Sequence, residues 1–158
     1  MAEPTYSTEL LNIADAVRLE LVGATAGTFT LAFTPTLKPR LIVKLVDLST
    51  LNVSVVPVSV MEKSLTRAAN AYEQVLDVVI LKNLTLVGGD VAVTEADSLM
   101  NLAEEIRAFL WTKPRLTAYT GAALIGTQFI NGEPFQRDRL ENLNEFQCIL
   151  RLTYRTVR

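Results

Sequence analysis

The sequence predicts an α+β domain, with a mostly antiparallel β-sheet of about four to five strands and two helices packed on it. Two segments repeat apolar residues at helical spacing, and several others alternate or are rich in β-branched residues. The last strand has one apolar and one polar face, which is typical of an antiparallel sheet covered on one side. With 158 residues, 49% of them hydrophobic, the chain is long enough for one domain with its own core, and we treat residues 1–158 as that domain.

The first element is an amphipathic helix, predicted over residues 8–22. Ser7 can cap its N-terminus, Glu9 lies in the first turn where the helix dipole favours an acid, and Gly23 can end it. The apolar stripe is Leu10, Ile13, Ala14, Val17 and Leu21. This stripe predicts a face that packs on the sheet.

A strand is predicted next over residues 28–33, because every second residue from Phe29 is apolar, and Pro35 should break it. The apolar segment 41–46 is consistent with a strand or a packed loop, and 47–50 with a turn. Taken together, 28–46 could instead form an extended arm or loop.

Two further strands are predicted over 52–60 and 72–81, joined by a polar connection at 62–70. The first is apolar on both faces, so we expect burial on both sides. Pro57 lacks an N–H group, which predicts an unpaired or bulged position there.

The second helix is predicted over residues 95–111, with Thr94 as its cap and Pro114 beyond its end. Its apolar stripe is Leu99, Leu102, Ala103, Ile106, Phe109 and Leu110, while Glu104, Glu105 and Arg107 face outward. Trp111, at the end of this helix, is interpreted as either a core residue or an anchor between subunits.

A strand over 122–130, a polar loop over 131–144 and a strand over 146–157 complete the chain. On the last strand Phe146, Cys148, Leu150, Leu152 and Tyr154 should face the core, and Gln147, Arg151, Thr153 and Arg155 should face away. The loop over 131–144 is a candidate partner-binding segment.

The composition argues against most catalytic chemistry. The chain has no histidine and one cysteine, which excludes histidine-based triads, histidine metal ligands and an intrachain disulfide. Cys148 lies on the apolar face of its strand, where a thiol is unreactive. Asp77 stands among apolar residues, and we expect it to pair with Arg151 or Arg155. We therefore expect no enzyme activity, cofactor or metal.

Charge and hydropathy point to a protein made in the cytoplasm. The net charge is −2, which disfavours a dedicated nucleic-acid binder. Residues 1–112 carry eight basic and thirteen acidic side chains, whereas 113–158 carry seven basic and four acidic ones. No apolar run is long enough for a membrane span, and the first residues do not form a signal peptide.

Two stretches resemble a family. They are the run 47–57, DLSTLNVSVVP, followed by LTR at 65–67 and the strand 72–81, and the run 143–155, LNEFQCILRLTYR. Together with the order of the helices, these runs resemble the tail terminator, or tail completion, proteins of tailed bacteriophages and prophages. The likeness spans roughly residues 8–157 in order, although the segments 28–46 and 113–131 contribute little to it.

The resemblance implies a structural virion protein at the tail and neck. Such proteins form a ring, usually a homohexamer, that ends the tail tube and docks to the head-side connector. The implied partners are other copies of the chain, the tail tube protein, connector or other neck proteins, and in contractile tails the sheath or its terminator. DNA would pass through the ring only as cargo, and no membrane is involved.

Two alternatives stay open: another neck component, such as a head-closure or connector protein, and a cytosolic α+β ligand-binding module. We expect contacts with neighbouring copies or partners through the outward face of the last strand and the loop before it. The candidate interface residues are Phe135, Arg137, Arg139, Arg151 and Arg155.

Overall fold

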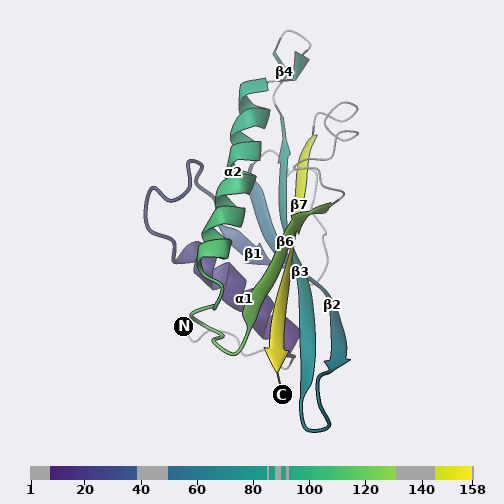
Figure 1. Ribbon diagram of the computed structural model, residues 1–158. Coiled ribbons are helices and arrows are strands. Elements are labelled where there is room, and N and C mark those ends of the chain that lie inside the picture. Colours follow the sequence, from purple (N-terminus) through teal and green to yellow (C-terminus); the bar gives the residue numbers. More distant parts are fainter. Residues whose placement is uncertain are drawn as a thin grey trace.

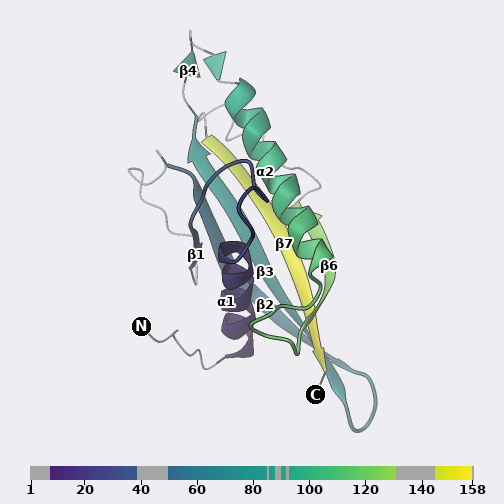
Figure 2. The ribbon, with the colours of Figure 1, turned by 90° about the vertical axis from the view of Figure 1, so that its left-hand side faces the viewer.

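A five-stranded sheet carries both helices on one face (Figures 1 and 2). The computed structural model describes residues 8–38, 50–84, 86–87, 90–91, 93–130 and 145–157. In chain order the elements are α1 (Glu9–Val22), β1 (Pro35–Leu37), β2 (Asn52–Ser64), β3 (Asn70–Asn83), β4 (Leu86–Val87), β5 (Asp90–Val91), α2 (Val93–Thr112), β6 (Ala123–Phe129) and β7 (Glu145–Val157). This arrangement confirms the predicted α+β class.

The strand order across the sheet is β1-β2-β3-β7-β6. β1 runs parallel to β2, whereas the β2–β3, β3–β7 and β7–β6 pairs are antiparallel. The sheet is therefore mixed, but mostly antiparallel as expected. β4 and β5 form a separate small ladder between β3 and α2.

The two helices lie where the apolar spacing places them, but their ends differ from the prediction. Thr8, not Ser7, caps α1, because its Oγ1 accepts a hydrogen bond from the Leu11 N–H at 3.3 Å. Gly23 ends this helix as expected, in a right-handed conformation with φ −79°. α2 begins at Val93, so Thr94 lies inside its first turn instead of capping it.

The strand predicted over 28–33 is wrong. In its place the chain crosses α2 as an irregular segment, because the Glu105 carboxylate accepts hydrogen bonds from both the Thr30 N–H (2.9 Å) and the Thr30 hydroxyl (2.7 Å). The Phe29 ring packs edge-on against Phe109 of α2, with ring centroids 5.4 Å apart. The strand β1 begins instead at Pro35, a residue tolerated at the first position of a strand. The expectations for 41–46 and for most of 47–50 lie outside the described residues.

The connection predicted over 62–70 is present but shorter, because the strands on both sides extend into it and form a long hairpin. β2 continues to Ser64 and β3 starts at Asn70, with a turn in which the Leu65 and Thr66 N–H groups each donate to the Ala69 carbonyl at 3.1 Å. The turn of this hairpin projects past the end of β7 (Figure 1). The bulge predicted at Pro57 is confirmed, because the β2–β3 register shifts between Pro57 and Ser59.

The core lies between the two helices and the facing side of the sheet. The predicted inward residues of β7, from Phe146 to Tyr154, are all buried, and so is the stripe of α2 apart from the half-buried Phe109. The expectation that β2 is buried on both sides holds only for Val53–Val55. Beyond the bulge its side chains are exposed, because no described element covers them.

Candidate interaction surfaces

The side of the sheet opposite the helices carries an ion pair at its centre. Asp77 and Arg151 stand opposite each other on β3 and β7, and the carboxylate accepts two hydrogen bonds from the guanidinium, at 3.0 and 3.2 Å. The hydrogen bond from Arg151 to Asp77 raises the pKa of the arginine. The predicted pairing of Asp77 is confirmed, with Arg151 as its partner.

A second cluster lies nearer the hairpin on the same side. Glu73 of β3 accepts hydrogen bonds from Lys63 of β2 at 3.0 Å and from Arg155 of β7 at 3.1 Å. These hydrogen bonds, first from Lys63 and then from Arg155, lower the pKa of Glu73. The prediction that the sheet is covered on one side only, with its other side in water, is therefore partly wrong. Glu73, Asp77 and Gln147 are buried on the side away from the helices.

The structure describes two of the five candidate interface residues, and the other three lie outside the described residues. Arg151 and Arg155 do lie together on the side away from the helices, but each is engaged by an acid of its own sheet. Phe135, Arg137 and Arg139, with the whole loop 131–144, lie outside the described residues. The interface role of all five stays a prediction.

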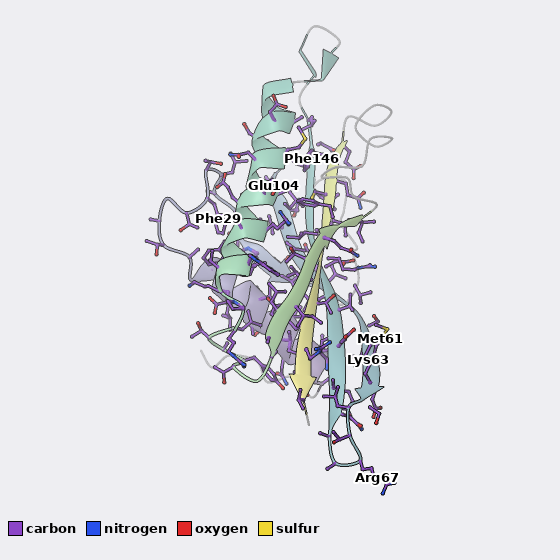
Figure 3. The ribbon with its side chains drawn as sticks, in the orientation of Figure 1. Phe29, Met61, Lys63, Arg67, Glu104 and Phe146 are labelled. Atoms are coloured by element: carbon purple, nitrogen blue, oxygen red, sulfur yellow. The ribbon has the colours of Figure 1, made fainter. Side chains whose placement is uncertain are left out.

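Exposed apolar side chains gather on the β2–β3 hairpin (Figure 3). Val60 and Met61 are each about half exposed, at 48% and 49%, and Leu65 in the turn reaches 54%. Val58 at the bulge is exposed as well. We call Val58, Val60, Met61 and Leu65 the hairpin patch.

A second group of exposed apolar side chains surrounds β6 at the opposite edge of the sheet. Trp111 near the end of α2 is 56% exposed, and Ile125 on β6 and Val157 at the end of β7 are exposed too. We call Trp111, Ile125 and Val157 the β6 patch. The exposure of Trp111 rules out the core role and leaves open the anchor between subunits.

Apart from Trp111, for which the sequence leaves an anchor role open, the residues of these two patches are not predicted as contact residues from the sequence. Alternation shows which residues share a face of a strand, but not whether another element covers that face. The available signal was the excess of β-branched residues in β2, which was interpreted as burial on both sides.

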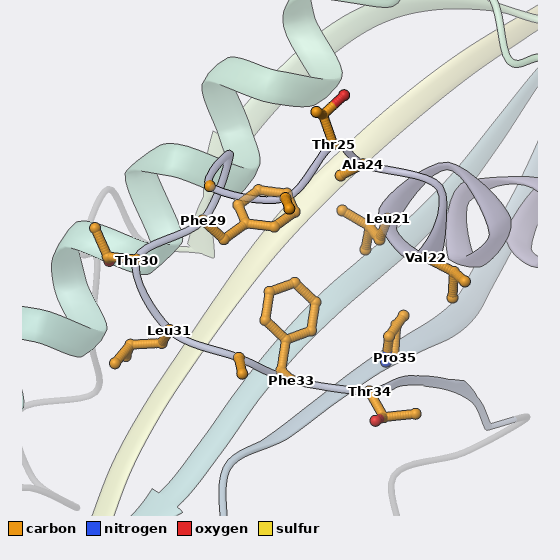
Figure 4. A pocket seen from close by; sticks show the side chains of 13 residues that line it. Leu21, Val22, Ala24, Thr25, Phe29, Thr30, Leu31, Phe33, Thr34 and Pro35 are labelled. Atoms are coloured by element: carbon orange, nitrogen blue, oxygen red, sulfur yellow. The ribbon is translucent and has the colours of Figure 1, made fainter.

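An apolar pocket of about 440 Å³ lies between the end of α1 and the segment that follows it (Figure 4). Its lining includes Leu21, Phe29, Phe33 and Pro35 and contains no charged residue. Three threonines line the pocket as well, but no acid or base is among the lining residues. The mostly apolar lining suits a small apolar molecule.

The titratable groups in the interior are structural. Burial raises the pKa of the Cys148 thiol to about 12, which keeps it protonated and inert. Burial of Glu20 alone would raise its pKa, but hydrogen bonds from Thr117 and the charge of Lys113 lower it, so this carboxylate ties the segment after α2 to α1. Within the described residues, no three acidic or cysteine side chains are grouped to hold a metal ion.

Comparison with known proteins does not assign the chain to a family. No protein-family model matches it, and no curated protein matches it. No helix among the described residues is long and apolar enough to cross a membrane.

Proposed function

We propose that the chain is a structural subunit of a tailed bacteriophage, a tail terminator that forms a ring at the end of the tail tube. One ring face would match the tube and stop its growth, and the other would provide the docking surface for the head-side connector. The ring would be a homohexamer in the virion neck, assembled from chains made in the host cytoplasm. Its work would be done by shape and contacts, with no reaction.

The observation that carries the proposal is the place of the resembling stretches in the sheet. The described parts of those stretches form β2 up to Pro57 and most of β3 and β7, which are neighbours in the sheet. The likeness therefore involves the framework of the domain and not a peripheral loop. The order of α1, β2, α2 and the closing strand β7 agrees with the order on which the resemblance rests.

One feature of the surface supports an assembly role. The exposed apolar side chains gather at two opposite edges of one sheet, which is where a subunit would meet its neighbours.

The decisive experiment combines the purified chain with tail tubes of the same phage. We expect rings of about six copies by native mass spectrometry and negative-stain imaging, and one ring at one end of each tube. Tubes that keep growing in the presence of the chain, or a chain that stays monomeric at high concentration with tubes present, would overturn the proposal. Gene order separates a terminator from another neck component, because a terminator gene should lie just upstream of the tube or sheath genes.

The second candidate is the ligand-binding module, and the pocket shown in Figure 4 is the observation that favours it. If the chain is such a module, it should bind a fluorescent apolar dye while it is monomeric. The Phe33→Asp variant should lose this binding, because it places a charge in the apolar lining. Dye binding by a permanently monomeric chain would favour this candidate over the ring.

A further inference from the structure

The outer edge of β6 is covered at its start by the chain that leads into it. The Leu124 N–H donates to the Pro114 carbonyl at 2.7 Å, and Arg115 forms an antiparallel β-bridge with Ala123. These contacts lie on the side of β6 that faces away from β7. We call the segment 113–117, which joins α2 to this edge, the edge cover.

Beyond the edge cover, the same edge of the sheet is open. From Gly126 to Phe129, β6 pairs with β7 alone among the described strands. An unpaired strand edge is a template on which another strand can pair. The edge cover therefore decides how much of β6 is available to such a strand.

An apolar contact and a carboxylate hold the edge cover in place. Leu116, in the middle of the segment, is fully buried in the core. The Thr117 N–H donates to the Glu20 carboxylate of α1 at 2.5 Å, and Lys113 Nζ lies 3.6 Å from the same carboxylate. Glu20 therefore contacts both ends of the edge cover, although it lies 97 residues before Thr117 in the chain.

The surroundings of Glu20 make its charge depend on the edge cover. Glu20 is only 6% exposed, and a buried charge is costly unless it is paired and hydrogen-bonded. The titratable groups that face it are Lys113 and Tyr154 of β7, and burial and then the charge of Glu20 raise the pKa of this tyrosine. Tyr154 is therefore neutral, and Lys113 supplies the opposite charge. A cavity of about 320 Å³, lined by Glu20, Lys113 and Thr117 among others, opens to solvent and lets a proton reach the carboxylate.

The contacts of Glu20 also fix the direction of its dependence on pH. Burial alone would raise its pKa, but the hydrogen bonds from Thr117 and the charge of Lys113 outweigh burial and lower the pKa below 4.5. The stabilisation that the carboxylate gives to the edge cover is therefore complete above pH 4.5. It is lost as the pH falls through the lowered pKa that Glu20 has in the folded chain.

We propose that Glu20 is an acid-sensitive latch, which holds the edge cover on the start of β6 at neutral pH and releases it in acid. Protonation removes the attraction to Lys113 and weakens the hydrogen bond from Thr117. Leu116 stays as an apolar anchor, so acid loosens the edge cover before it unfolds the domain. The latch does not depend on the proposed ring, because all of its contacts lie within one chain.

Hydrogen exchange of single amides, corrected for the intrinsic exchange rate, tests the latch. In the wild type, the protection of the Leu124 and Thr117 amides should be constant above pH 4.5 and should fall below it. In Glu20→Gln the charge is absent at every pH. These two amides should then be about tenfold less protected at neutral pH, with a flat dependence on pH. The amides that pair β3 with β7 report global unfolding and serve as the internal reference.

A second variant and a matched control accompany this measurement. Lys113→Met removes the charge at the other side of the latch, and its side chain is 45% exposed, so the substitution leaves the core intact. It should lower the protection of the Leu124 amide, and combining it with Glu20→Gln should add little, because both act through one contact. Glu104→Gln is the control, since it neutralises an exposed carboxylate whose partner is Arg107, and it should behave as the wild type.

The outcomes decide the latch separately from the proposed function. Unchanged protection of the Leu124 amide in Glu20→Gln overturns the latch. It is overturned too if the β3 amides of the wild type lose protection at the same pH as Leu124, because the opening is then global. Should circular dichroism show that Glu20→Gln is unfolded, the wild-type pH profile and Lys113→Met decide in the same way. Ring formation by any of these chains bears only on the proposed function.

Discussion

The two halves of β2 have similar chemistry but different surroundings. Val53 and Val55 are buried at 1% and 0% exposure, under α1 and beside β1, whereas Val60 is 48% exposed on the hairpin. All three are valines of the same strand, and all three pair with β3. The comparison shows that a β-branched run specifies a strand, whereas the neighbouring elements decide whether it is core or contact surface.

The largest expected effect lies in the covered half of the molecule. Ile106 of α2 is fully buried against the sheet. Ile106→Ala should lower the free energy of unfolding by about 2–5 kcal/mol, because it leaves a cavity in the core. The next residue, Arg107, is exposed, and Arg107→Ala should change the stability by less than about 0.5 kcal/mol in urea unfolding. Equal losses of stability in the two variants would contradict the burial of Ile106 in the core.

The valines of β2 test the comparison directly. Val55→Ala should cost about 1.5–3 kcal/mol, the value of fully burying such a side chain. Val60→Ala should cost less than about 0.5 kcal/mol in the monomer. Thermal unfolding of both variants at low protein concentration is the measurement, and a similar loss from both would show that the hairpin is covered within one chain.

An intermediate effect is expected for the ion pair between Asp77 and Arg151. A double-mutant cycle with Asp77→Ala and Arg151→Ala should give an interaction energy of about 1 kcal/mol, because the pair is partly exposed and bidentate. The same cycle with Glu104 and Arg107, an exposed pair on α2, should give a few tenths of that value. Equal interaction energies for the two pairs would show that the position of Asp77 and Arg151 in the sheet does not strengthen their ion pair.

The smallest effect is a dependence on pH near the hairpin. The pKa of Glu73 is lowered below its ordinary value of 4.5, so its contribution to stability is complete above that value. This contribution is lost as the pH falls below 4.5 and passes through the lowered pKa that Glu73 has in the folded chain. Glu73→Gln should therefore flatten the decline of stability below pH 4.5, measured by urea unfolding at a series of pH values. An unchanged slope would contradict the lowered pKa.

Most of the regular elements could be predicted from local patterns. The stripe of α2 and the inward residues of β7 were predicted because period and alternation report directly which side of an element is apolar. A basic partner on the last strand, Arg151 or Arg155, could be predicted for Asp77 because a buried charge requires a partner. The register of β3 against β7 selects Arg151. The bulge at Pro57 followed from the missing N–H group.

The errors in the strands and in the exposed faces share one cause, which is contact, or its absence, with segments distant in the chain. The segment 28–33 alternates like a strand, but the Glu105 carboxylate and the Phe109 ring hold it against α2. The parallel pairing of β1 with β2 joins segments far apart in the sequence and leaves no local signal. In the sequence, the residues of the hairpin patch and the β6 patch are apolar like core residues, so the sequence does not show that they are exposed.

By itself the sequence determined the α+β class, the order of most elements and the residues that face inward, because these depend on local spacing of apolar side chains. The tertiary structure decided which apolar faces are covered, where β1 pairs, and which edges of the sheet stay open. Covering a face requires another element to pack on it, and that depends on contacts between distant segments. The surfaces proposed for assembly belong to this second group.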